Sequence, residues 1–589
     1  MKSWPKKNHF ISPSQGSGKA GSRTADHLLV LRFLVDKYVL GQGKKLYSCF
    51  VDLQKAFDTV PRSKLFYKLL KEYSVGGKFL KILQEIYRGN KMFVKTNNGL
   101  LQPFVTTIGV KQGCVLSPIL FNIFIDKINE VFDESCAPIK INNLNLNCLL
   151  WADDLVIFSQ TAEGLQNSID KMKIFYKNLG LKINVKKTKI MIFNKRGLSL
   201  KGKYNFFLGG EALEVTDQYQ YLGLKIRPSG AMGLAVEELN TKATKAWFSI
   251  SKILYKHKRL EVRRSLQIFD SLIVPISTYG AEFWLPHSLP AKSFRSFDNL
   301  LNCWENFVPE KINQKCCRLI LGVHKKASRL AVLGELGRHP LLIKSLSHSL
   351  NYKLNLNKNR DSDSILGNVM VEMNAMADQS QDCWLTRVQK IEKLLKIQNL
   401  PSLSRTSGKI IFNDLKEKFE TFWKRKLTEE KIGTDNINHN ILRTYSNLKN
   451  NFNLEPYLTL VRNRTQRMHI TRLRISAHNL NIERGRYKGL TVAQRICKYC
   501  PSSNIDDEFH FLNKCKTFLT SRNCLFKKFT ALEPTFEMLT ENEKFKRLLN
   551  PKTAQETKIV NKFINIMFDW REKIDKGFPI TNLSIYFAK

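Results

Sequence analysis

The feature that most constrains this chain is a pair of adjacent acidic residues, Asp153 and Asp154, inside an apolar run. Residues 148–158 read CLLWADDLVIF, so apolar residues flank the pair on both sides. Carboxylates are rarely buried unless they are paired or bind a metal ion. The flanks predict two short buried strands with the acidic pair near the turn between them. Two interpretations are open: a type I turn, in which Asp is common, or a rigid hairpin that holds Mg²⁺ through oxygen ligands.

The charge of the chain favours a polyanionic partner. Its 589 residues include 95 Lys and Arg against 51 Asp and Glu, a net charge of +44, and the length indicates several domains. The most apolar stretch, residues 268–285, is interrupted by Asp270, Pro275 and Glu282. No membrane-spanning segment is therefore predicted, and nucleic acid is a better partner than a membrane. Twelve scattered cysteines favour a reducing, intracellular setting over a disulfide scaffold.

Asp52 is the expected partner of the acidic pair. It lies at the end of a strand-like run, residues 47–53, and a loop follows. Phosphoryl transfer by two Mg²⁺ ions about 3.5–4 Å apart needs carboxylates from neighbouring strands. One ion lowers the pKa of an attacking 3′-hydroxyl, and the other neutralises the triphosphate. Asp52 with Asp153 and Asp154 has that arrangement.

Five motifs, in the order of the family, resemble the reverse transcriptase of LINE-type (non-LTR) retrotransposons. They are FVDLQKAFD around Asp52, GVKQGCVLSP from Gly109, ADD from Ala152, GLKINVKKTK from Gly180 and YLG from Tyr221. The resemblance implies an α+β right-hand polymerase palm with partial fingers, then a helical thumb and an α-rich basic C-terminal region with a small zinc-binding element. The boundaries are 1–24 for a disordered, basic start; 25–226 for the palm; 227–350 for the thumb; 351–440 for a spacer with some helix; and 441–589 for the basic region.

The resemblance also implies roles for single residues. Asp52, Asp153 and Asp154 would bind two Mg²⁺ ions, or Mn²⁺. Phe57 would be the steric gate against ribonucleotides. Gln112 and Gly113 would contact the template and the incoming nucleotide, and Lys187 would contact the triphosphate. The residues themselves leave alternatives open. Phe57 could be a core residue, Lys186 or Lys189 could replace Lys187, and Asp58 is read as a helix N-cap outside the metal site.

A second cluster, Cys497, Cys500, His510 and Cys515, is predicted to bind zinc. Four ligands with no open position indicate a structural zinc rather than a catalytic one. The nine residues between Cys500 and His510 are a loose spacing, so unrelated cysteines remain the alternative, and Cys524 and His478 are nearby substitutes. Basic residues precede the cluster: Arg462, Arg464, Arg467, Arg472, Arg474, Arg484, Arg486 and Lys488. The region resembles the zinc-binding element that follows the reverse transcriptase in LINE proteins, where it is associated with holding template RNA and target DNA.

The sequence therefore predicts an RNA-directed DNA polymerase that extends a DNA 3′-hydroxyl on an RNA template. Its partners would be the RNA template, the DNA primer or target, and dNTPs, with no membrane. The protein would be intracellular: it would act in the nucleus, and it would also form an RNA–protein complex in the cytoplasm. No endonuclease and no earlier fingers motifs precede the palm, so we expect a truncated reading frame in which polymerase activity can be lost. The rival is a non-catalytic nucleic-acid-binding remnant or co-opted protein. A maturase or telomerase fits the palm but less well the C-terminal cluster.

Overall fold

The computed structural model describes residues 11–19, 21–257, 259–358, 364–397, 407–432 and 442–577. The chain forms two compact units, each assembled from three segments. The first unit contains Met1–Glu238, Gly280–Leu289 and His348–Ser404, and the second contains Leu239–Tyr279, Pro290–Ser347 and Arg405–Lys589. Helices α7 (Gly233–Lys256) and α14 (Leu341–Lys358) each contribute residues to both.

The first unit is built on a six-stranded sheet. Its strands, in spatial order, are β11 (Phe206–Leu208), β12 (Glu211–Val215), β10 (Lys189–Phe193), β1 (Leu46–Val51), β9 (Asp154–Ser159) and β8 (Cys148–Trp151). β1 runs antiparallel to both of its neighbours, whereas β10 and β12 are parallel. Every residue of β1 is buried. This central place explains why β1 is apolar almost throughout: both of its faces lie in a core.

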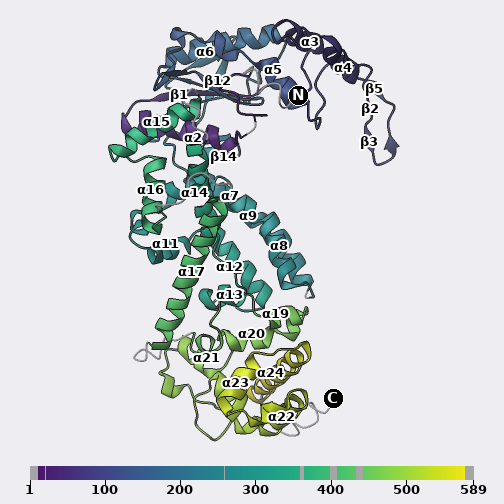
Figure 1. Cartoon of the computed structure of the whole chain (residues 1–589), viewed down its shortest axis with the longest axis vertical. Helices are drawn as coiled ribbons and strands as arrows, with labels where there is room; N and C mark the ends of the chain where they lie inside the picture. The colour runs from purple at the N-terminus through teal and green to yellow at the C-terminus, as the bar shows by residue number, and fades with distance from the viewer. Residues whose placement is uncertain are drawn as a thin grey trace. The chain divides into compact units, whose positions relative to one another are not determined.

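Helices cover both faces of the sheet. Figure 1 shows α6 (Ala162–Leu179) on one face, and α2 (Thr24–Leu34) and α15 (Ile365–Asp378) on the other. Both ends of α6 are capped: the Thr161 hydroxyl accepts from the Gly164 N–H at 3.0 Å, and Gly180 ends the helix at φ 81°. The remaining elements of this unit are η1 (Val35–Gly41), α3 (Arg62–Lys71), α4 (Gly77–Tyr87), β2 (Lys91–Met92), β3 (Lys95–Thr96), β4 (Gly99–Leu100), β5 (Phe104–Val105), α5 (Ser117–Ile125), η2 (Ile128–Val131), η3 (Glu134–Cys136), β6 (Ile139–Ile141), β7 (Leu144–Leu146), β13 (Tyr219–Tyr221), β14 (Leu224–Ile226), α10 (Ala281–Ser288) and α16 (Trp384–Leu395).

The expected spacer with some helix over residues 351–440 contains two helices in residues 365–395. These residues form α15 and α16, which pack within the same unit as the sheet. Trp384 is fully buried, and its indole N–H donates to the Glu282 carbonyl at 2.7 Å. The Asn- and Lys-rich composition obscured the apolar positions of α16, which recur at helical spacing. Residues 359–363, 398–406 and 433–441 lie outside the described part of the chain.

The expectation of disorder over residues 1–24 is wrong for residues 11–19; residues 1–10 are not described. Ser14 and Gln15 are almost completely buried. The Ser14 carbonyl accepts from the Leu150 N–H, and the Gly16 N–H donates to the Leu150 carbonyl, both at 2.9 Å. β8 is an edge strand, so its unpaired backbone groups need partners. A Ser- and Gly-rich segment supplies them, and a reading based on composition misses this role.

The second unit is helical, as predicted for most of it. Its elements are α8 (Val262–Leu272), α9 (Val274–Ser277), η4 (Ala291–Phe294), α11 (Phe297–Trp304), α12 (Val308–Leu321), α13 (Arg329–Glu335), α17 (Ser407–Ile432), α18 (Tyr445–Leu448), α19 (Tyr457–Leu460), η5 (Arg464–Gln466), α20 (Met468–Arg474), α21 (Asn481–Tyr487), η6 (Val492–Gln494), η7 (His510–Lys514), η8 (Lys516–Phe518), α22 (Leu519–Leu532), η9 (Pro534–Met538), α23 (Glu541–Leu549) and α24 (Ala554–Asp575). Within the described ranges, no helix has the length and apolar character needed to cross a bilayer.

Candidate active site and metal centre

The structure brings the three predicted carboxylates to one end of the sheet. β1 and β9 pair antiparallel with Val51 opposite Leu155. Asp52, the residue after β1, therefore stands opposite Asp154, the first residue of β9. Asp153 lies in the turn between β8 and β9, where Ala152 takes a φ of 57°. A tight hairpin beside the central strand thus places all three carboxylates together.

Two of these carboxylates, Asp153 and Asp154, are hard to ionise. Partial burial, followed by the charges of Asp153 and Asp52, raises the pKa of Asp154 to about 6. Burial and the charge of Asp52 also raise the pKa of Asp153. Among the described residues, none of the groups that shift these two pKa values is a cation. An oxygen-only site with unbalanced negative charge is suited to a divalent cation such as Mg²⁺.

Asn184 holds Asp52 in place, and the sequence interpretation did not assign it a role. Its side-chain amide donates to Asp52 Oδ2 at 3.0 Å, and its backbone N–H donates to the Asp52 carbonyl at 2.8 Å. The Thr188 hydroxyl accepts from the Asp52 N–H at 3.3 Å. Asn184 lies within the motif that begins at Gly180. The motif marks this segment as functional, but it does not single out Asn184 among its residues.

The acidic hairpin is also supported from the N-terminal loop. The Gln15 side-chain carbonyl accepts from the Ala152 N–H at 3.1 Å, at the turn itself. The Trp151 ring packs edge-on against His27, with 5.4 Å between centroids. Gly16 passes so close that a Cβ there would lie 2.4 Å from His27 Nε2. The N-terminal loop around Gln15 and Gly16 therefore packs against the turn of the β8–β9 hairpin and stabilises it.

Phe57, Gln112 and Gly113 lie around the loop that follows Asp52. Phe57 is half-buried and stacks on Phe121 with centroids 4.6 Å apart, so part of its ring is available to a ligand and part belongs to the core. Gln112 is exposed, and its amide donates to Asp58 Oδ1 at 2.9 Å. Asp58 is therefore not a helix N-cap; it ties the first motif to the second. Gly113 is exposed, with a φ of 81°.

The lysine cluster divides in the structure. Lys189 lies in β10 and pairs with Glu214 at 2.6 Å. Lys186 and Lys187 are both exposed on the turn that contains Asn184. Lys187, the predicted triphosphate contact, and its alternative Lys186 are thus equally exposed, whereas the other alternative, Lys189, is already paired.

The hairpin of β13 and β14 lies against the same end of the sheet. The Tyr219 ring stacks on Phe50 with centroids 4.4 Å apart, and Phe50 is two residues before Asp52. Burial and the Asp154 carboxylate raise the pKa of both Tyr219 and Tyr221. The hairpin that contains the YLG motif is thus within electrostatic reach of Asp154.

The second predicted cluster also comes together. One potential ligand atom from each of Cys497, Cys500, His510 and Cys515 lies within 4.8 Å of the others, and all four residues are buried. In a tetrahedral zinc site, bond lengths of 2.0–2.3 Å place ligand atoms about 3.3–3.8 Å apart. Thiolates with one imidazole are a donor set typical of structural zinc, so these residues fit the ion.

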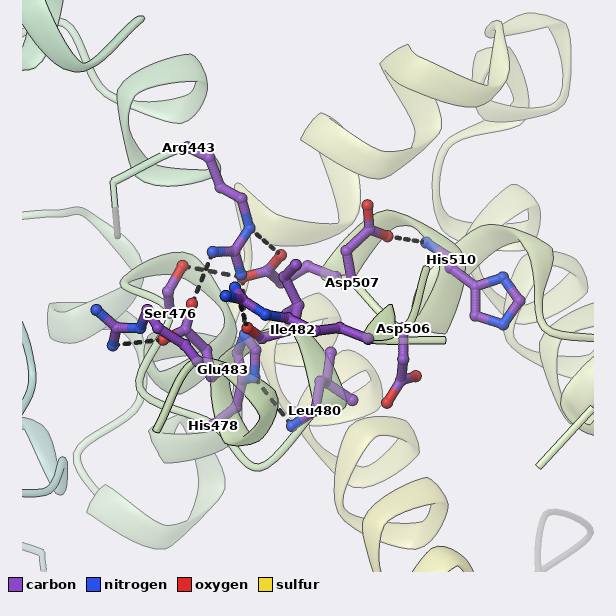
Figure 2. A network of polar contacts seen from close by, with 12 residues as sticks. Arg443, Ser476, His478, Leu480, Ile482, Glu483, Asp506, Asp507 and His510 are labelled. Carbon is purple, nitrogen blue, oxygen red and sulfur yellow. Dashed lines mark hydrogen bonds and ion pairs between the residues drawn. The ribbon is translucent and has the colours of Figure 1, made fainter. Parts of the chain in front are cut away.

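Three consecutive acidic residues anchor the loop of this cluster. Glu508 is buried and accepts from Arg443 and His478 at 2.7 Å and from Ser476 at 2.9 Å. Figure 2 labels the three donors of this network, Arg443, Ser476 and His478. Burial alone would raise the pKa of Glu508, but the charge of Arg443 holds it far below its usual value.

His478 is occupied by this network. Its Nδ1 accepts from the Leu480 N–H, so Nε2 carries the proton that is donated to Glu508. This excludes His478 as the substitute zinc ligand in the described arrangement.

Asp506 and Arg571 connect the cluster to α24. Arg571 donates to both Asp506 oxygens, at 3.0 and 2.8 Å, and its Nη2 lies 3.7 Å from Cys497 Sγ. The guanidinium also lies over the Tyr499 and Phe511 rings, 4.5 and 4.8 Å from their centroids. Asp507 accepts from the His510 N–H at 2.7 Å. A residue 61 positions beyond His510 thus supports the cluster.

The basic residues before the cluster have different roles. Arg474 is fully buried and pairs with Glu335 and Glu455, each at 2.7 Å. Arg486 pairs with Glu483 at 2.7 Å, and Arg462 pairs with Glu261 at 2.9 Å. These arginines are therefore already neutralised, whereas Arg484 and Lys488 are exposed.

Comparison with known proteins finds a family match for the part of the chain that contains the six-stranded sheet. Residues 6–226 match the family of the reverse transcriptase (RNA-dependent DNA polymerase). These residues form a reverse transcriptase domain. The predicted resemblance is confirmed over this range, which contains all three carboxylates.

Proteins similar to this chain include polyproteins of retrotransposable elements and a probable RNA-directed DNA polymerase of a transposon. The chain is 31% identical over 206 residues to the Pol polyprotein of retrotransposable element R2DM of Drosophila melanogaster, covering 33% of this chain and 19% of that protein. It is 28% identical over 205 residues to the R2 polyprotein of Nasonia vitripennis, again covering 33% of this chain and 19% of that protein. It is 24% identical over 245 residues to the probable RNA-directed DNA polymerase of transposon BS of Drosophila melanogaster, covering 40% of this chain and 26% of that protein. The chain thus spans about a fifth of the R2 relatives. A solved telomerase of Candida tropicalis, with a fragment of telomeric RNA, covers 70% of this chain and 54% of its own at 13% identity and a TM-score of 0.30.

Proposed function

We propose that this chain is the RNA-directed DNA polymerase portion of a non-LTR retrotransposon protein. It extends a DNA 3′-hydroxyl with dNTPs on an RNA template. The observation that carries the proposal is the register of β1 and β9, which sets Asp52 opposite Asp154 with Asp153 in the adjoining turn. Work on target DNA would place the protein in the nucleus.

Asp52, Asp153 and Asp154 would hold the metal ions. When bound, two Mg²⁺ ions, with Mn²⁺ as a substitute, activate the 3′-hydroxyl and neutralise the triphosphate and leaving pyrophosphate. Asn184 keeps the Asp52 carboxylate oriented, and the Gln112–Asp58 hydrogen bond fixes the loop that faces template and nucleotide. Phe57 is the residue proposed to clash with a ribonucleotide 2′-hydroxyl, and Lys187 the one proposed to meet the triphosphate.

Incorporation of dNTPs on an RNA template with an annealed DNA primer tests this function. Asp52→Asn and Asp154→Asn keep the side-chain shape but remove a charge. We expect each to reduce the rate by at least about 100- to 1,000-fold, because metal coordination supplies several kcal/mol of transition-state stabilisation. Asp170→Asn, on the exposed face of α6, makes the same change elsewhere and should leave the rate unchanged. RNA binding without any incorporation by the wild-type chain would instead support a binding protein without catalysis.

We further propose that Cys497, Cys500, His510 and Cys515 bind one structural zinc ion. Zinc would join the loop of Cys497 and Cys500 to the segment of His510 and Cys515, and its binding free energy would add to folding stability. Metal analysis of the purified chain should find about one zinc per chain. Cys515→Ser should remove it, whereas Cys524→Ser, a change outside the cluster, should not. Retention of zinc by Cys515→Ser would exclude this ligand set.

A further inference from the structure

Residues 88–108 form an arm that projects from the reverse transcriptase domain. Within it, β2 pairs with β5 and β3 pairs with β4, and every residue of these four strands is exposed. Figure 1 shows β2, β3 and β5 beyond α4, away from the six-stranded sheet. The arm contains Arg88, Lys91 and Lys95 and has no acidic residue in its sequence. Because its strands pair with one another, the contacts at its base set the direction of the arm.

Arg62, the first residue of α3, contacts both ends of this arm. Its Nη1 donates to the Tyr87 carbonyl at 3.1 Å, just before the arm, and to the Thr106 carbonyl at 2.6 Å, near the end of the arm. Its Nη2 donates to the Thr106 hydroxyl at 3.1 Å and to the Ile108 carbonyl at 2.9 Å. Its Nε donates to the Gly109 carbonyl at 2.9 Å. All five N–H donors of the guanidinium are therefore used, and together they form a clamp on the base of the arm.

The contacts continue into the loop of the second motif, residues 109–113. The Gly109 N–H donates to the Val60 carbonyl at 2.9 Å, and the Val110 N–H donates to the Phe57 carbonyl at 2.8 Å. The clamping arginine comes two residues after Val60 in the sequence. One short segment, which begins at Phe57, therefore holds both the base of the arm and the start of this loop.

Tyr87 adds an aromatic contact at the same point. Its ring is buried, and the Arg62 guanidinium lies 5.2 Å from the ring centroid. The Lys111 ammonium, which belongs to the loop, lies 5.8 Å from the same centroid. A guanidinium is planar, stacks on aromatic rings and holds five donors in a fixed arrangement, whereas an ammonium has three donors and no plane. The clamp therefore depends on the shape of the Arg62 side chain as well as on its charge.

We propose that Arg62 is a positioning residue, which fixes the arm and the loop of residues 109–113 relative to Phe57. This loop contains Gln112 and Gly113, which in the proposed function contact the template and the incoming nucleotide. Displacement of a substrate-positioning group by about 1 Å can lower a rate by about 100-fold, so the base of the arm has to be held firmly. The effect on nucleotide binding rests on the proposed polymerase function, whereas the clamp itself does not.

Hydrogen exchange of the full chain tests the clamp without any substrate. Arg62→Lys keeps the charge but has three donors in place of five. We expect exchange in residues 106–110 to become about 10-fold faster or more, with β1 and α6 unchanged, because hydrogen bonds from a charged group are lost only at this point. Thr106→Val removes the hydroxyl acceptor and keeps the side-chain shape, so it should give a smaller increase in the same residues. Thr107→Val makes the same change at an exposed neighbour and should give none.

Incorporation of dNTPs on an RNA template with a DNA primer provides the second readout. We expect Arg62→Lys to raise the KM for dNTP by about 10-fold with a smaller change in kcat, because the loop moves and the three carboxylates do not. Thr106→Val should raise the KM less, and Thr107→Val should leave it unchanged. A purely structural role would not separate KM from kcat in this way.

The two readouts separate the clamp from the polymerase function. Unchanged exchange of residues 106–110 in both Arg62→Lys and Thr106→Val would overturn the clamp. Faster exchange spread equally over β1 and α6 would show a general loss of stability, and this too would overturn it. In an active chain, a local increase in exchange with an unchanged KM would overturn the positioning role. If the wild-type chain incorporates no dNTP, the polymerase proposal fails, and the exchange result alone decides whether Arg62 clamps the arm and the loop.

Discussion

At the scale of single residues, the partial burial of Asp154, together with the charges of Asp153 and Asp52, should make metal binding depend on pH. The pKa of Asp154 is about 6, and a divalent cation needs the ionised form. We expect Mg²⁺ affinity, measured by calorimetry, to rise as pH increases through about 6 and then to level off. Asp170→Asn should show the same rise. A flat affinity across this range would contradict the prediction.

Without metal, the raised pKa of Asp154 should also make the stability of the fold depend on pH. The folded chain keeps a proton on Asp154 that the unfolded chain releases near its ordinary pKa of about 4. The contribution of Asp154 to the free energy of unfolding should therefore decrease as pH rises from about 4 to about 6. Urea unfolding of the wild-type chain and of Asp154→Asn, compared over this range, isolates that contribution. Added Mg²⁺ should remove the decrease, because binding favours the ionised form.

Asn184 is predicted to act through Asp52. Asn184→Ala removes the 3.0 Å hydrogen bond to Asp52 Oδ2 but keeps the backbone bond. Loss of such a supporting contact costs about 10- to 100-fold in metal affinity or activity. We expect a higher Mg²⁺ concentration for half-maximal incorporation, with recovery of the rate at saturating Mg²⁺. Asn178→Ala, on the exposed end of α6, is the control. Equal Mg²⁺ requirements in the two variants would show that Asn184 does not position the ligand.

Gly109 is required by both its conformation and its surroundings. Its φ is 84°, and a Cβ would lie 2.6 Å from the Asp58 carbonyl oxygen. Gly109→Ala should lower the free energy of unfolding by about 2 kcal/mol or more. The cost has two causes: alanine would be held in a left-handed backbone conformation, and its Cβ would overlap the Asp58 carbonyl oxygen. Gly210→Ala has a φ of 93° and open space around it, so it should show the conformational cost alone, about 1 kcal/mol. Urea unfolding compares them; equal losses would mean that the loop moves freely.

Residues with a distinct chemical pattern were the ones the sequence could predict. Asp153 and Asp154 stand out because carboxylates are unusual between buried strands, and the structure sets them beside Asp52 as expected. Asn184 was not predicted, because an amide in a polar loop has many equivalent interpretations. Gln15 was missed for a related reason: its bond to the Ala152 N–H joins positions 137 residues apart, and no local pattern reports such a contact.

At the scale of elements, α24 and the Cys and His cluster should behave as one folding unit. Arg571 contacts Cys497 Sγ and holds Asp506, so it supports a ligand and its loop together. We expect Arg571→Lys to weaken zinc retention by about 10- to 100-fold in competition with a chelator. In the Co²⁺-substituted protein, the sulfur-to-metal charge-transfer band should also shift, because an N–H donor to sulfur is lost.

The control for Arg571 is Arg547→Lys. Arg547 pairs instead with Glu533 and Glu556, at 2.7 and 2.8 Å. It should change neither zinc retention nor the Co²⁺ spectrum. A general loss of stability in Arg571→Lys without a spectral shift would contradict a specific role at the cluster.

Elements were predictable where local signals agreed. In α6, the Thr161 cap, the apolar spacing and the Gly180 stop all indicate one helix, and the structure has it. In residues 365–395, some helix was expected, but its place in the core was not, because α15 is buried against α2 and α16 against α10. Local pattern thus gives the existence of an element more readily than its partners.

At the scale of the whole molecule, the helices α10 and α14–α16 should be needed for the stability of the reverse transcriptase domain. Tyr352 donates to Asp26 at 2.9 Å, and Glu372 pairs with Lys37, so late segments bind the α2 region directly. Trp384→Ala removes a fully buried ring of α16, and we expect a loss of about 3–5 kcal/mol. Hydrogen exchange should show the added opening in β1 and α2. Val371→Ala, at an exposed position of α15, should change stability by less than about 0.5 kcal/mol. Unchanged protection of α2 in Trp384→Ala would show that the domain is independent of these helices.

The three-segment build of this unit also bears on how the protein is made. β10 ends at Phe193, but α16 is complete only at Leu395. At synthesis rates of about 5–20 residues per second, roughly 10–40 s separate these two points on the ribosome. During that interval the buried face of α2 has no α15 or α16 to cover it. A nascent chain of this protein therefore offers chaperones a defined time window, and ribosome stalling between these positions should leave the polymerase domain aggregation-prone.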